Sequence, residues 1–139
     1  MSAITNEELL RRAVEVTRKP QVAALTRKGW ENMGYVGCAL ITDRGNLYTG
    51  VVLNLQCGLG FCAEHSAIAE MVKAGESRIA RIVAATAQGM PLPPCGRCRE
   101  IVYQIDPGNV DTEVLLPDGE SRLLAQLLPD NWQRYWDKP

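Results

Sequence analysis

Two short segments carry residues that can do chemistry, Cys62-Ala63-Glu64-His65 and Pro94-Cys95-Gly96-Arg97-Cys98. Each is expected where a loop meets the first turn of a helix. There, unpaired N–H groups and the helix dipole lower a thiol's pKa toward the thiolate that a metal requires. Cys95 and Cys98 are three residues apart, so one turn can bring both sulfurs to one ion, and Cys62 can supply a third. Three protein ligands with one open position are typical of catalytic zinc.

The carboxylate of Glu64 is suited to proton transfer beside such an ion. Zinc lowers the pKa of a bound water from about 16 to about 7. Glu64 follows Cys62 by two residues, so it points to another side of the helix and can stand next to the metal without ligating it. A carboxylate there can take the water's proton and return it to a leaving group. Three thiolates weaken zinc as a Lewis acid, and Arg97, Arg99 and His65 are candidates to offset their charge.

Two other interpretations of the same residues stay open. Cys62 and His65 together with Cys95 and Cys98 make a complete Cys₃His set, which would be a closed structural zinc site in a non-catalytic domain. A redox pair of Cys95 and Cys98 is the second alternative. It leaves Cys62 and Glu64 without a role.

Composition limits the remaining classes of function. The chain has 139 residues, 46% of them hydrophobic, and a net charge of −1, which predicts a single domain over 1–139. Without a basic field we expect no nucleic-acid partner. The acidic start and the lack of about 18 consecutive apolar residues argue against a secretory signal and a membrane span, so we expect a cytoplasmic protein. Five cysteines fit a disulfide framework poorly, and Cys38 and Cys57 are expected to be buried as small hydrophobes.

Hydrophobic periodicity and turn residues predict an α/β fold. A capping pattern at Thr5 to Glu8 begins the first helix, and Pro20 ends it and begins a short second one that runs to Leu25. The other expected elements are a hairpin of strands 35–42 and 47–55, a helix 62–74, a strand 81–86, an extended loop 89–94, a helix 95–105, a strand 112–116, a turn 117–119 and a helix 123–128.

The two segments that can do chemistry are similar to those of the cytidine deaminase superfamily. Its members carry His-x-Glu or Cys-x-Glu followed by Pro-Cys-x-x-Cys, and both phrases are present here. The likeness extends to Val36-Gly37-Cys38-Ala39-Leu40, to residues 43–50 and to Leu127-Leu128-Pro129, and so covers roughly residues 36–132. Short length and all-cysteine ligands resemble the free-nucleoside cytidine deaminases and blasticidin S deaminase.

This resemblance implies a three-layer sandwich, with a mixed five-stranded sheet covered by helices on both faces. It also implies Zn²⁺, a homotetramer whose sites are completed by neighbouring subunits, and a small pyrimidine as substrate. Glu64 would carry protons while activated water attacks C4 of a cytosine ring and ammonia leaves, and the backbone of Ala63 would contact the base. The family's Arg after Cys-Ala-Glu, which hydrogen-bonds a ligand sulfur, is His65 here.

The sequence departs from the family where the sugar is held. Cytidine deaminases carry Asn-x-Glu on the second strand, whereas this chain has Val52 and Asn54, or, one register over, Asn54 and Gln56. Gly34 stands where an aromatic residue usually lines the pocket, while Trp132 keeps an aromatic that can stack on a base in an adjacent subunit. The substrate therefore stays open between cytidine or deoxycytidine, a modified analogue, blasticidin S and a free pyrimidine base.

Overall fold

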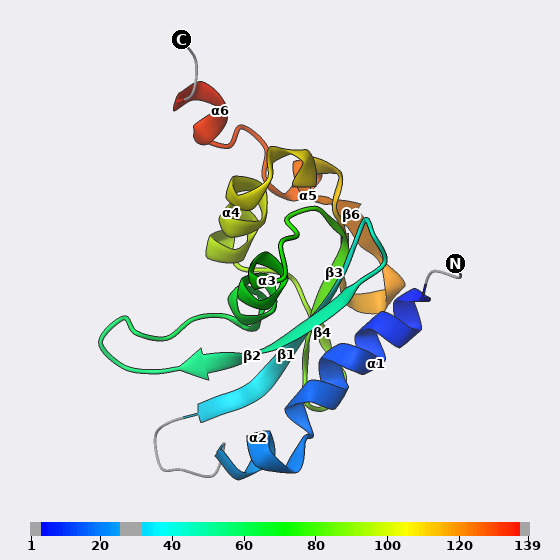
Figure 1. Ribbon diagram of the computed structural model, residues 1–139, viewed down its shortest axis with the longest axis vertical. Helices are drawn as coiled ribbons and strands as arrows, with labels where there is room; N and C mark the ends of the chain where they lie inside the picture. The colour runs from blue at the N-terminus through cyan, green and yellow to red at the C-terminus, as the bar shows by residue number, and fades with distance from the viewer. Residues whose placement is uncertain (1–3, 26–31, 137–139) are drawn as a thin grey trace.

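The computed structural model describes residues 4–25 and 32–136 (Figure 1). At its N-terminal end lie α1 (Asn6–Thr17) and α2 (Pro20–Leu25). The hydroxyl of Thr5 accepts a hydrogen bond of 3.1 Å from the backbone N–H of Glu8 and so caps α1, as the sequence predicts. Pro20 begins α2, a position that suits its fixed φ and missing N–H.

A β-hairpin forms the first part of the sheet. Its strands β1 (Asn32–Thr42) and β2 (Leu47–Asn54) pair antiparallel and are joined through Gly45, whose φ of 84° favours glycine. The pairing register shifts between Met33 and Gly37. The hairpin predicted from the turn residues is confirmed.

The complete sheet is mixed and has six strands, in the order β2-β1-β3-β5-β6, with β4 also paired to β3. β3 and β5 run parallel, and the other pairs are antiparallel. The four further strands are β3 (Ile79–Thr86), β4 (Pro91–Leu92), β5 (Glu113–Leu115) and β6 (Ser121–Leu123). The sequence patterns predict four of the six strands and miss β4 and β6, which are too short to show a period of two. The five strands that the resemblance implies are one fewer than observed. The loop expected to be extended before Pro94 is extended, and it contributes β4.

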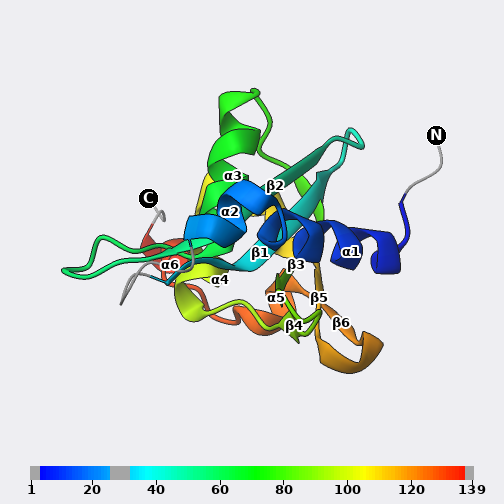
Figure 2. The same cartoon turned by 90° about the horizontal axis from the view of Figure 1, so that it is seen from below.

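Helices cover both faces of the sheet, which confirms the three-layer α/β arrangement (Figures 1 and 2). α1 lies on one face, and α3 (Ala63–Lys73), α4 (Gly96–Ile105) and α5 (Leu124–Leu127) lie on the other. The alternation of β1 shows the two cores: Cys38 and Leu40 pack with α3, whereas Ala39 and Ile41 pack with α1. Two short 3₁₀ turns, η1 (Pro107–Asp111) and η2 (Pro117–Gly119), complete the connections, the second at the predicted turn.

The two cysteines outside the paired segments differ in their burial. Cys38 is fully buried, as predicted, but the same prediction for Cys57 is wrong. Cys57 is exposed in the turn after β2 and has a φ of 60°. A turn at the end of a strand lies at the surface, so the thiol has no core to enter.

The chain ends in a short aromatic helix, α6 (Gln133–Trp136). Trp132 and Trp136 meet edge to face with ring centroids 5.8 Å apart, and both are at least half exposed together with Tyr135. Over the described ranges, no helix combines the length and the apolar character that crossing a bilayer requires.

Candidate functional site

The starts of α3 and α4 meet beside the sheet and bring the predicted metal ligands together. Cys62 is the residue before α3, and Cys95 is the residue before α4, with Cys98 in the first turn of that helix. The sulfur of Cys95 lies 3.5 Å from that of Cys62 and 3.4 Å from that of Cys98. All five cysteines are free thiols. Residues more than 30 positions apart thus form one cluster of sulfurs.

The donor set fits zinc. Two thiolates on a tetrahedral zinc ion, each about 2.3 Å from the metal, are roughly 3.8 Å apart, close to the sulfur separations here. A ring nitrogen of His65 also lies within 4.8 Å of the sulfurs of Cys62 and Cys98. The Nε2 atom of His65 is buried and has no hydrogen-bond partner among the described residues. Both ligand sets considered from the sequence therefore fit the structure: three sulfurs alone, or three sulfurs with an imidazole.

The three thiols differ in acidity. Burial acts to raise the pKa of Cys95, but hydrogen bonds from the backbone N–H groups of Cys98 and Arg97 and from the neighbouring thiols bring it below the ordinary value. This is the helix-start effect expected from the sequence. For Cys62 and Cys98, burial prevails and raises the pKa. The prediction of lowered thiol pKa values is therefore correct for one cysteine and wrong for two, because burial by neighbouring elements outweighs the helix start.

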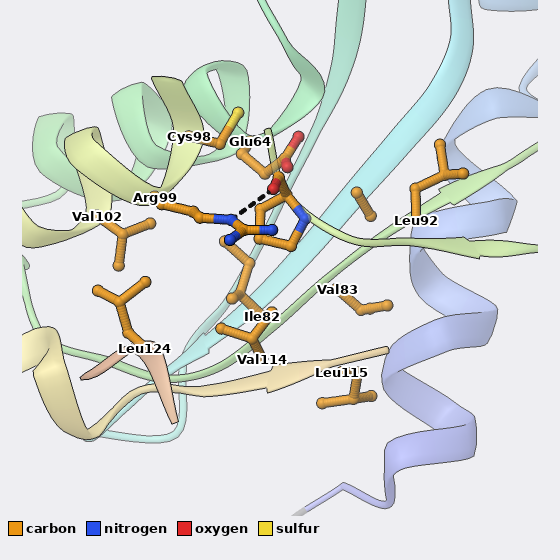
Figure 3. Close-up of a pocket in the computed structure, with 12 residues that line it drawn as sticks. Glu64, Ile82, Val83, Leu92, Cys98, Arg99, Val102, Val114, Leu115 and Leu124 are labelled. Carbon is orange, nitrogen blue, oxygen red and sulfur yellow. Dashed lines mark hydrogen bonds between the residues drawn. The ribbon is translucent and has the colours of Figure 1, made fainter. Parts of the chain in front are cut away.

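Glu64 is buried in the first turn of α3, with only 5% of its surface exposed. Burial raises its pKa above the ordinary value, against smaller opposing effects of its own backbone N–H and the thiol of Cys98. The close-up in Figure 3 shows Glu64 beside Cys98 above a layer of apolar side chains. They enclose a cavity of about 10 Å³, which Glu64 borders together with Val83, Val102 and Leu124. A carboxyl group in such surroundings keeps a proton more readily than one in water.

A second and larger pocket of about 180 Å³ is also lined by Glu64. Its polar lining residues are Cys62, Glu64 and Cys95. Its apolar lining residues are Val36, Val52, Ala63, Ala84, Leu92 and Pro93. The sulfur cluster and the buried acid therefore face one space large enough to admit a small planar molecule.

The residues expected to contact substrate fall into two groups. Ala63 is buried at the start of α3 and lines the larger pocket. Asn54 and Gln56 are exposed and lie outside its described lining, where Val52 is present instead. Trp132 is half exposed beside α6 and is also outside that lining. Sequence reasoning missed Leu92 and Pro93 as lining residues, although their position just before Pro94-Cys95 was a usable signal.

The two arginines of the second segment donate hydrogen bonds to backbone carbonyl oxygens rather than to the sulfurs. Arg99 donates to the carbonyl oxygens of Pro94 and Leu127, and the first of these bonds is dashed in Figure 3. Arg97 donates to the carbonyl oxygen of Gly60 at 3.2 Å. After burial, the charge of Arg97 is the second cause that lowers the pKa of His65. His65 is therefore neutral near pH 7 and adds no positive charge beside the sulfurs.

Known proteins resemble this chain in sequence and in fold. Residues 5–113 match the family model described as the cytidine and deoxycytidylate deaminase zinc-binding region. A cytidine deaminase of Mycobacterium tuberculosis is 33% identical over 97 residues, which are 68% of this chain and 70% of that protein. The crystal structure of a cytidine deaminase from Mycobacterium leprae superimposes with a TM-score of 0.74 at 29% identity, over 91% of this chain and all of that one. The crystal structure of the M. tuberculosis cytidine deaminase superimposes with a TM-score of 0.75 at 26% identity, over 93% of this chain and 98% of that one.

The family model spans most of the chain, and the curated relatives reach over two thirds of it. The residues matched by the family model, 5–113, contain the sulfur cluster and Glu64 described above. The chain belongs to the family of cytidine and deoxycytidylate deaminases that have this zinc-binding region.

Proposed function

We propose that the protein is a zinc-dependent hydrolytic deaminase that converts a cytosine-type ring to the uracil form and releases ammonia. One observation carries the proposal: the sulfurs of Cys62, Cys95 and Cys98 form one cluster, of which Cys62 and Cys95 line the same pocket as the buried carboxyl of Glu64. Named cytidine deaminases among the relatives support the same reaction.

Cys62, Cys95 and Cys98 would hold the zinc ion. When bound, zinc lowers the pKa of a water molecule to about 7 and so supplies the nucleophile at neutral pH. In the overall reaction a C4–O bond forms, the C4–N bond to the exocyclic amino group breaks, and one water molecule is consumed. The pocket walls hold the ring with its amino group directed toward the sulfurs.

Glu64 would move the protons. As a carboxylate it accepts a proton from the attacking water, and as a carboxylic acid it delivers protons to the ring nitrogen N3 and to the departing amino group. Burial raises the pKa of Glu64. It favours this delivery of protons because a buried acid still holds its proton closer to neutral pH. The backbone of Ala63, which also lines the pocket, would contact the base.

Substitution of Glu64 tests the proposal directly. Glu64→Gln is expected to retain zinc and to lower kcat by about 10²- to 10⁴-fold, because the amide cannot exchange protons. The matched control is Glu70→Gln on the exposed side of the same helix, which should keep wild-type activity. Ammonia release and bound zinc are measured together. Full activity in Glu64→Gln would mean that another group transfers the protons.

His65 distinguishes the open site from the closed Cys₃His alternative. In the proposed enzyme, the neutral imidazole of His65, which lies within 4.8 Å of two of the sulfurs, would donate a ring N–H to a ligand sulfur once the ion is bound. His65→Asn keeps a donor and should therefore retain stoichiometric zinc. Loss of zinc and of folding in that variant would favour an imidazole ligand and a structural, non-catalytic site.

The assembly and setting follow from the same proposal. We propose a single domain over residues 1–139, a homotetramer in the cytoplasm and a role in pyrimidine metabolism. The exposed rings of Trp132, Tyr135 and Trp136 are suited to an interface with a neighbouring subunit, where Trp132 can reach a base. Light scattering of the purified protein, with Trp132→Ala as the variant, tests this arrangement.

A further inference from the structure

The wall of the larger pocket indicates which part of a substrate the protein can recognise. At one end are Cys62, Glu64 and Cys95, the polar groups among its described lining residues. Everything else in that lining is apolar, with β1 contributing Val36, β2 contributing Val52 and the loop before α4 contributing Leu92 and Pro93. A ring placed with its amino group at the sulfurs therefore directs its N1 substituent along apolar side chains.

The position of Val52 is the central feature of this wall. It is partly buried and, like Val36, packs against the core under α3. The nearest amide-bearing residues along the chain, Asn54 and Gln56, are exposed and lie outside the described lining. The register shift in β1, between Met33 and Gly37, lies opposite Val52, and Gly34 within it adds no side chain. Apart from Cys62, Glu64 and Cys95, the described lining residues thus offer no side-chain donor or acceptor to a sugar hydroxyl.

We propose that this deaminase recognises the cytosine ring without hydrogen-bonding the sugar hydroxyls. Its substrate class is then a cytosine whose N1 substituent is absent, apolar or poor in hydroxyl groups, accepted at least as well as the ribonucleoside. This inference rests on the proposed deaminase function and specifies its substrate. A hydroxyl group moved from water onto apolar walls loses its hydrogen bonds, whereas a site built to bind that hydroxyl gains from it.

The two kinds of pocket predict opposite trends when hydroxyls are removed. A site that hydrogen-bonds a hydroxyl disfavours the analogue lacking it by about 10⁴- to 10⁵-fold, whereas an apolar pocket disfavours the added hydroxyl by about 10²-fold at most. The series cytidine, 2′-deoxycytidine and 2′,3′-dideoxycytidine removes hydroxyl groups one at a time and leaves the ring unchanged. The ratio of kcat/KM along this series therefore reports on how the site accommodates the sugar hydroxyls.

The experiment measures ammonia release by the zinc-replete full chain from this series and from cytosine and 1-methylcytosine. We expect kcat/KM for 2′,3′-dideoxycytidine to equal or exceed that for cytidine, by up to about 100-fold. A lower value for the dideoxynucleoside would overturn the inference and leave the deaminase function standing. Turnover of no compound would contradict the deaminase function itself, and the inference with it.

A nearly isosteric variant then tests Val52 without disturbing the fold. Val52→Thr places one hydroxyl in the wall, and we expect it to raise kcat/KM for cytidine relative to 2′,3′-dideoxycytidine by about 3- to 10-fold. Val51→Thr makes the same change one residue earlier, on the opposite face of β2, and should leave that ratio at the wild-type value. An unchanged ratio in Val52→Thr, or an equal change in both variants, would overturn the assignment of Val52 to the substrate wall.

Discussion

The Nε atom of Arg99 donates a hydrogen bond of 2.8 Å to the carbonyl oxygen of Pro94, the residue directly before Cys95. Its Nη1 atom donates to the carbonyl oxygen of Leu127 at 3.0 Å, at the end of α5. A single guanidinium thus fixes α4, the loop that carries the first sulfur of the Cys-x-x-Cys pair, and the C-terminal part of the chain. The rigid fork of arginine makes this possible, because it aims several N–H groups in fixed directions.

Replacing Arg99 by lysine is expected to loosen the sulfur cluster. The ammonium group of Arg99→Lys cannot reach both carbonyl oxygens, and one charge-assisted hydrogen bond is worth about 1.5–3 kcal/mol. Urea unfolding should show a loss of about that size, and a chelator should remove zinc faster than from the wild type. The control is Arg122→Lys, whose guanidinium pairs with Glu120 at the surface. Equal zinc loss from both variants would contradict the role given to Arg99.

Gly50 is predicted to be intolerant of any side chain. A Cβ atom there would lie 2.3 Å from the backbone nitrogen of Ala67 and 2.6 Å from the Cβ of Ser66, so β2 and α3 would have to separate. Gly50→Ala should lower the free energy of unfolding by about 1–3 kcal/mol or more. Gly96→Ala, where a Cβ would meet open space, is the control and should unfold like the wild type. The comparison is made by denaturant titration, and a stable Gly50→Ala protein would show that the two elements are not tightly packed.

Glu76 is expected to make stability depend on pH in the acidic range. The hydroxyl of Tyr48 donates to its carboxylate at 2.6 Å and Asn46 donates at 2.9 Å. The hydrogen bond from Tyr48 is the main cause that lowers the pKa of Glu76 below its ordinary value of 4.5, and burial opposes it. The unfolded chain therefore takes up the proton first as pH falls. The stabilisation is complete above about pH 4.5 and is lost as pH falls through the lower folded value.

Stability curves of the wild type and Glu76→Gln measure this effect. The wild type should be the more stable protein near pH 6, and the difference should shrink below pH 4.5. Glu7→Gln, on the exposed surface of α1, is the control for the general effect of removing one acid. A difference between wild type and Glu76→Gln that stays constant from pH 6 to pH 3 would show that the carboxylate is not held in its charged form.

Asn109 is predicted to be the most sensitive polar position of the core. Its amide donates to the carbonyl oxygens of Ser77 and Val102 and accepts from the backbone N–H of Ile79, all at 2.9–3.0 Å, and the side chain is fully buried. Asn109→Ala leaves those three backbone groups without partners, at about 1–3 kcal/mol each. Thermal unfolding should show a loss of at least 3 kcal/mol. The exposed Asn54→Ala should change stability little, and similar melting of the two variants would refute this role for Asn109.

Local patterns in the sequence predict the elements that carry the site. The starts of α3 and α4 follow from residues near Cys62 and Cys95, and the hairpin follows from the turn at Gly45. These features depend on neighbours along the chain, which the sequence displays. β4 and β6 have too few residues to show a period, so the sequence patterns miss both strands.

Contacts between distant segments are the part that the sequence does not display. The bond from Arg99 to Leu127 joins residues 28 positions apart, and nothing near either residue signals it. The raised pKa of Cys98 likewise follows from burial under elements elsewhere in the chain. The exposed position of Cys57 depends on where β2 ends. The apolar run up to Leu55 predicts an end at Leu55, one residue later than the observed end at Asn54.

Cys62 and Cys95 stand one residue before two different helices and are separated by 33 positions, yet their sulfurs nearly touch. An ion shared by these sulfurs acts as a cross-link across that long segment, in the way a disulfide closes a loop. Demetallation would free both helix starts in the same event. Amide exchange protection at the first turns of α3 and α4 should therefore fall together when zinc leaves, while α1, on the other face of the sheet, keeps its protection.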